Sequence, residues 1–130
     1  MPFKTPYRGI WGIKRSTLKM MLEAAKSSHP REFAALLRAK DGIITELVLL
    51  PGTVSGKRHA SLPLHMLPID FTVVGSVHSH PAPHTHPSSD DLFFFGKFGR
   101  IHILISYPYD EGSWQAYDLS GSPLELKIVD

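Results

Sequence analysis

Cysteine is absent from the 130-residue chain, and this absence excludes several classes of protein. Disulfide scaffolds, zinc fingers with cysteine ligands and thiol nucleophiles all require it. The zinc deaminases are excluded as well, because their metal needs a Pro-Cys-x-x-Cys element. Any metal bound by this protein must therefore be held by histidine, aspartate or glutamate.

Long hydrophobic runs and a strong charge of one sign are also lacking. No apolar run approaches the ~20 residues that a membrane helix needs, and the first residues contain no apolar signal core. This predicts a soluble, cytoplasmic protein with no membrane partner. Fourteen Lys and Arg residues against 12 Asp and Glu residues leave a net charge of only +2, which argues against a nucleic-acid partner.

Hydrophobic residues are sufficient for one core. They make up 42% of the chain, and the length is that of one domain. Residues 1–130 are therefore predicted to form a single domain. We expect it to fold alone or as a homo-oligomer such as a homodimer.

The pattern of apolar residues predicts an α/β (α+β) domain. Leu18, Met21, Leu22 and Ala25 share one face of a helix over residues 16–28, with Ser16 as its N-cap. Asp-Gly at 41–42 predicts a hairpin between strands 32–38 and 43–50. The remaining pattern predicts a short strand over 61–66, buried strands over 71–78 and 101–107, a helix over 88–97, and a last strand pair, 114–119 with 124–129.

Histidines are concentrated after the first buried strand. Four of the eight lie between residues 78 and 86. Side chains at i and i+2 of a strand point to the same face, so His78 and His80 could present their ring nitrogens to one ion. The second His-x-His, His84 and His86, could compete for the metal. It lies between prolines where no strand fixes the side chains, however, so a surface loop or substrate rim is the favoured interpretation.

Asp91 is the natural third ligand. Ser88 and Asp91 lie on one face of the first turn of the predicted helix, which could fold back over the strand end. Ser88-x-x-Asp91 is also typical of a helix capping box, and one pair of residues can serve both purposes. Two imidazoles and a carboxylate leave the fourth position of a tetrahedral zinc to water, as in catalytic zinc sites. The sequence predicts one zinc ion per chain.

These residues resemble the JAMM motif of the MPN-domain metalloproteases. The motif here comprises His78-Ser79-His80-Pro81, Ser88 and Asp91, with Glu32 upstream in a Pro-x-Glu context. The resemblance covers nearly the whole chain in the order of its elements. It implies a single MPN-like (cytidine-deaminase-like) domain, with a mixed, mostly antiparallel sheet flanked by helices.

The resemblance also implies roles for the site residues. It makes His78, His80 and Asp91 the zinc ligands, Glu32 the general base and acid that moves a proton from the zinc-activated water, and Ser88 a donor to the tetrahedral oxyanion. The family cleaves isopeptide or peptide bonds after the C-terminal tail of ubiquitin-like proteins.

The chain departs from the family pattern in two ways. Ala35 stands where the family usually has glycine, a change that concerns packing rather than chemistry. The chain is also too short for the insertions with which eukaryotic members hold ubiquitin. A minimal prokaryotic or archaeal-type member is therefore expected, with a small ubiquitin-like or sulfur-carrier protein as its substrate.

Two other function classes remain open at this point. A non-catalytic MPN-like scaffold or binding module would typically have lost ligand residues, whereas all five positions are filled here. A metal-buffering or metal-sensing protein would use the histidine-rich loop without a base, and would bind several ions per chain.

Overall fold

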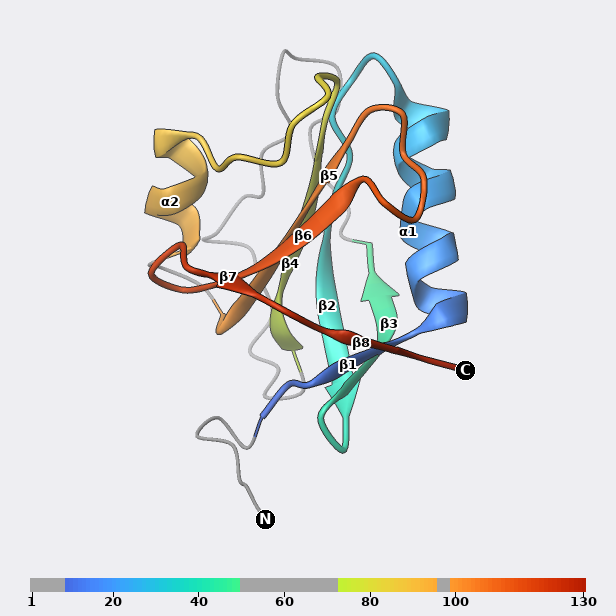
Figure 1. Cartoon of the computed structure of the whole chain (residues 1–130), viewed down its shortest axis with the longest axis vertical. Helices are drawn as coiled ribbons and strands as arrows, with labels where there is room; N and C mark the ends of the chain where they lie inside the picture. The colour runs from blue at the N-terminus through green and yellow to red at the C-terminus, as the bar shows by residue number, and fades with distance from the viewer. Residues whose placement is uncertain (1–8, 50–72, 96–98) are drawn as a thin grey trace.

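The computed structural model describes residues 9–49, 73–95 and 99–130, which form a mixed α/β fold. Within these ranges, eight strands make one sheet in the order β7-β6-β5-β4-β2-β3-β1-β8. Four of its seven strand pairings are antiparallel, so the expected mixed, mostly antiparallel sheet is confirmed. Figure 1 shows the two helices on opposite sides of the sheet. The short strand expected over 61–66 lies outside the described residues.

The first helix, α1 (Arg15–Ser28), packs its predicted apolar stripe on the sheet. Its buried residues are Thr17, Leu18, Met21, Leu22 and Ala25. The predicted N-cap at Ser16 is wrong, because the helix begins one residue earlier and Lys14 is its cap, without a side-chain hydrogen bond. Lys14 is also the last residue of β1 (Gly12–Lys14), which pairs with β8. The strand therefore passes directly into the helix, with no loop between them.

Membrane-spanning length is not reached by either helix. α1 has 14 residues and α2 (Ser89–Phe95) has seven. Within the described ranges, no helix is long and apolar enough to cross a bilayer.

The predicted hairpin is confirmed. β2 (Ala34–Lys40) and β3 (Ile43–Val48) are antiparallel, and the turn residues Asp41 and Gly42 have φ values of +54° and +81°. Positive φ at both central residues is the backbone of a type I′ turn, which matches the twist of the two strands. β2 begins two residues later than predicted, so Glu32 precedes the strand. Ala35 is fully buried within it.

The central strand is β4 (Val73–His80), with β2 antiparallel on one side and β5 (Ile101–Ser106) parallel on the other. Both predicted buried strands are therefore confirmed. Val77 and its neighbour Ile103 belong to the core under α1. His78 is paired with Leu104, which packs with Tyr117 in a separate cluster. Because side chains alternate along a strand, His78 and His80 lie on the face of the sheet away from α1.

The last part of the chain differs from the prediction. β6 (Trp114–Asp118) pairs with β7 (Pro123–Leu124) over only two residue pairs. The chain then enters β8 (Lys127–Val129), which pairs in parallel with β1. The predicted continuous strand over 124–129 is therefore wrong. Parallel pairing with a strand near the other end of the chain leaves no local sequence signal.

This path curls the sheet. β7 and β8 are its two outermost strands, yet only residues 125 and 126 separate them. Three Cα–Cα steps of 3.8 Å span at most about 11 Å, so the two edges of the sheet must come close together. Figure 1 shows the chain crossing from β7 to β8 over the front of the sheet.

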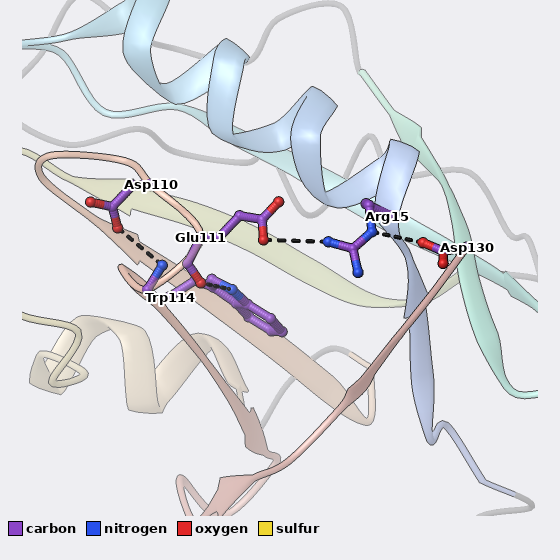
Figure 2. A network of polar contacts seen from close by, with 6 residues as sticks. Arg15, Asp110, Glu111, Trp114 and Asp130 are labelled. Atoms are coloured by element: carbon purple, nitrogen blue, oxygen red, sulfur yellow. Dashed lines mark hydrogen bonds and ion pairs between the residues drawn. The ribbon is translucent and has the colours of Figure 1, made fainter.

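Arg15 connects three segments at this closure. Its Nε atom lies 2.7 Å from Asp130 Oδ1, and its Nη1 atom lies 3.4 Å from Glu111 Oε1 (Figure 2). The connection between β5 and β6 is fixed further by the Trp114 indole, which donates to the Glu111 carbonyl at 2.9 Å. The start of α1, this connection and the residue after β8 are thereby held together.

Candidate metal and catalytic site

The candidate site begins at the carboxyl end of β4. His78 is buried and His80 is mostly buried. Because side chains alternate along the strand, both lie on the face of the sheet away from α1. Their register partners are Leu104 and Ser106 of β5. Side chains carried by a strand that is paired on both sides are held more precisely than side chains on a loop.

Asp91 reaches this strand end through the predicted capping box. Ser88 precedes α2, and its backbone N–H donates to Asp91 Oδ2 at 2.8 Å, while the Asp91 N–H donates to Ser88 Oγ at 3.0 Å. The same Oδ2 atom lies 3.2 Å from His80 Nε2. The capping box therefore fixes both the start of the helix and the direction of the carboxylate. The expected position of the first turn of α2 over the strand end is confirmed by this contact.

His80 and Asp91 each stabilise the charged form of the other. The hydrogen bond with Asp91 raises the pKa of His80 above its ordinary value, against the effect of burial, and the charges of Asp91 and Glu32 and the His84 backbone add to the increase. Burial would raise the pKa of Asp91, but hydrogen bonds from His80 and the Ser88 backbone, with the charges of His80 and His78, lower it. The carboxylate is thus held in its anionic form beside two imidazoles.

Glu32 lies near the same histidine. It is half-buried, and its charge acts on both His80 and the Tyr109 hydroxyl. The next residue, Phe33, makes two hydrogen bonds with Ser79. Glu32 is therefore the residue just beyond the end of the backbone pairing between β2 and β4.

The loop after β4 is held at several points. The Tyr117 hydroxyl donates to the Thr85 carbonyl at 2.6 Å, and the Tyr107 N–H donates to the Ala82 carbonyl at 3.1 Å. The side chains of His84 and His86 are exposed and their rings lie 5.5 Å apart. This agrees with the prediction that the second His-x-His lies in a surface loop.

Two of the three predicted zinc ligands, His80 and Asp91, lie at a separation that suits zinc. Two ligands at about 2.0–2.2 Å from a tetrahedral zinc lie about 3.3 Å apart, close to the 3.2 Å between His80 Nε2 and Asp91 Oδ2. In the part of the chain that the structure describes, however, no three side chains are gathered into one metal-binding group.

Comparison with known proteins identifies the family. The pattern of the family described as prokaryotic homologs of the JAB domain matches residues 14–120. The chain belongs to the prokaryotic JAB family. A probable metalloprotease of Haloferax volcanii is 39% identical to this JAB domain over 133 aligned residues, covering 95% of the chain and 82% of that protein.

Two solved structures also resemble this JAB domain. A JAB1/MPN domain protein from Archaeoglobus fulgidus is 44% identical, with a TM-score of 0.76 over 92% of this chain and 99% of that one. A structure described as a JAMM metalloprotease-like zinc site in the proteasome and signalosome is 41% identical, with a TM-score of 0.75 over 93% and 99%. The expected family and fold are confirmed, and the probable metalloprotease and the metalloprotease-like zinc site among these relatives support a metal-dependent enzyme.

Sequence reasoning missed several residues around the site of this JAB domain. Ser79 was predicted only as part of the histidine motif, and no role at the site was predicted for Tyr117. A cluster of three rings, His29, Tyr107 and Tyr109, was not predicted at all. The ring centroids lie 5.1–5.7 Å apart and the Tyr109 hydroxyl lies 2.6 Å from His29 Nδ1. These residues are far apart in the sequence, and no spacing rule connects them.

Proposed function

We propose that this JAB domain is a zinc-dependent metallopeptidase or isopeptidase with one zinc ion per chain. The observation that carries the proposal is the His80–Asp91 contact of 3.2 Å, held by the Ser88 capping box at the end of β4. Such a spacing suits two ligands of one tetrahedral ion. The metalloprotease relatives support the same chemistry.

In this proposal His78, His80 and Asp91 hold the metal. When bound, zinc supplies an acidified water as nucleophile and polarises the scissile carbonyl. Glu32 takes a proton at its carboxylate and gives it to the leaving amine, because it directly precedes Phe33, whose backbone is hydrogen-bonded to Ser79 between the two histidines. Ser88 donates its hydroxyl proton toward the developing oxyanion, because its oxygen is already used as the acceptor for the Asp91 N–H.

The proposed substrate is the C-terminal tail of a small ubiquitin-like or sulfur-carrier protein. Such a tail is extended and can add to a strand edge by backbone hydrogen bonds, and small residues such as Gly-Gly fit a narrow site before the cut. The net charge of +2 gives no reason to propose a nucleic-acid substrate. We propose a cytoplasmic enzyme that acts as a monomer or a homodimer.

The test combines metal analysis with a cleavage assay. The protein is purified without a histidine tag, its zinc content is measured, and it is given a fusion in which the Gly-Gly tail of a ubiquitin-like protein is followed by a fluorescent amine. We expect about one zinc per chain and zinc-dependent release of the fluorophore. A scaffold would bind no zinc, and a metal buffer would bind two or more ions.

Glu32→Gln is the matched control variant. Its amide can form hydrogen bonds but cannot accept a proton, so we expect full zinc content and a rate about 10²–10⁴-fold lower. Turnover at the parent rate would show that Glu32 is not the base.

A further inference from the structure

Ser79 lies between His78 and His80, but its side chain has a different environment. Side chains alternate along a strand, so the Ser79 hydroxyl points to the opposite face of β4 from the two imidazoles. It is fully buried there. Its Oγ atom accepts a hydrogen bond from the Phe33 N–H at 2.8 Å, and the Ser79 N–H donates to the Phe33 carbonyl at 2.9 Å.

These two bonds extend the pairing of β2 with β4 by one residue. The last residue pair of the ladder is Ala34 with His78. Beyond that pair the backbone no longer follows the ladder, and the Ser79 side chain provides the acceptor that Phe33 needs. Glu32 is the next residue, so its position relative to the histidines depends on how firmly Phe33 is held.

We propose that Ser79 is a positioning residue that keeps Glu32 in place beside His80. Ser79 does not touch the reacting atoms in this arrangement; it acts through the backbone of Phe33. The role rests on the proposed function, because Glu32 matters for catalysis only if the site cleaves its substrate. β4 thereby carries the two histidines on one face, and through Ser79 on its other face it holds the segment that contains Glu32.

Ser79→Ala is the direct test. Loss of the hydroxyl removes the acceptor for a buried N–H and loosens the segment that carries Glu32. We expect kcat on the Gly-Gly fusion to fall about 10–100-fold, the range found when supporting residues around a site are removed. KM should change less than about twofold and zinc content should equal that of the parent, because the ligands and the substrate keep their contacts.

Conservative variants distinguish positioning from general loss of stability. Ser79→Thr keeps the hydroxyl and should restore kcat, whereas Ser79→Cys offers only a weak sulfur acceptor and should fall between parent and alanine variant. Thr17→Val is the matched control. It also removes a buried hydroxyl bonded to a backbone carbonyl, that of Thr45 at 2.7 Å, but far from Glu32. It should lower the urea midpoint and leave kcat at the parent value.

A measurement independent of cleavage separates this proposal from the proposed function. Backbone NMR should show faster exchange of the Phe33 amide and a shifted Glu32 amide resonance in Ser79→Ala, with neither change in Thr17→Val. Unchanged signals would overturn the positioning role whatever the activity. Altered signals in Ser79→Ala together with a kcat equal to that of the parent would also overturn this role, and so would loss of zinc from that variant. If the parent cleaves nothing, the proposed function fails, and NMR alone decides whether Ser79 holds Glu32.

Discussion

Ser88→Ala separates two roles that one hydroxyl performs in the proposed site. The substitution removes the acceptor for the Asp91 N–H, a bond of 3.0 Å, but leaves the Ser88 N–H that donates to Asp91 at 2.8 Å. Half of the capping box survives. We therefore expect a loss of about 1 kcal/mol, within the 0.5–2 kcal/mol range for N-cap substitutions. For a domain of this size that loss lowers Tm by about 3–5 °C.

The catalytic effect of Ser88→Ala should be larger than its effect on stability. Removing one donor to an oxyanion typically costs about 10²–10³ in kcat, or about 2.7–4 kcal/mol. The zinc content should stay at the parent level, because the surviving backbone bond still directs Asp91 toward His80. Ser89→Ala is the matched control: it changes the adjacent exposed serine at the start of α2 and should leave kcat unchanged.

The assay compares kcat, KM, zinc content and the urea midpoint for the parent and both variants. A lowered midpoint with the parent kcat would return Ser88 to the role of a helix cap and refute its role as a donor. Loss of zinc would show instead that the Ser88 hydroxyl is needed to orient Asp91.

Three further predictions concern other parts of the structure. His78→Ala and His80→Ala should each lose stoichiometric zinc and activity while circular dichroism shows a folded domain, and retained zinc in both would contradict the ligand assignment. Tyr117→Phe removes a bond to the loop after β4; it should cost about 0.5–1.5 kcal/mol in urea unfolding and speed zinc release to a chelator. A hydrogen bond from Ser113 lowers the pKa of Asp110 in the folded state. Its contribution to stability is therefore complete above the unfolded pKa of about 3.9 and disappears as the pH falls through the lower folded value. The stability difference between parent and Asp110→Asn should close over that range, and an unchanged difference would contradict the assignment.

Local patterns in the sequence predicted most of the central fold. The Asp41–Gly42 hairpin, the buried face of α1 and the two buried strands each depend on neighbouring residues, so periodicity and turn chemistry were sufficient. The start of α1 was misplaced because β1, a strand of three residues, has too little pattern to be seen. The prediction over 124–129 was wrong for another reason: β8 pairs with β1, which lies at the far end of the described chain.

The candidate site was predictable where its residues lie close in sequence. The capping box of Ser88 and Asp91 is a three-residue spacing, and its contact with His80 followed from the turn between β4 and α2. The hydrogen bond between Ser79 and Phe33 joins residues 46 positions apart. Only the register of two strands brings that pair together, and register cannot be derived from either segment alone.

The closure of the sheet by β8 has a consequence for the kinetics of folding. Arg15 and Asp130, which meet where β8 runs beside β1, are 115 residues apart in the sequence. Bringing such distant segments together costs loop-closure entropy, so this pairing should form after the hairpin and the central strands. Contacts that form late have little influence on the folding rate, and their loss mainly accelerates unfolding. The short strand that completes the sheet should therefore set the lifetime of the folded protein more than the speed at which it folds.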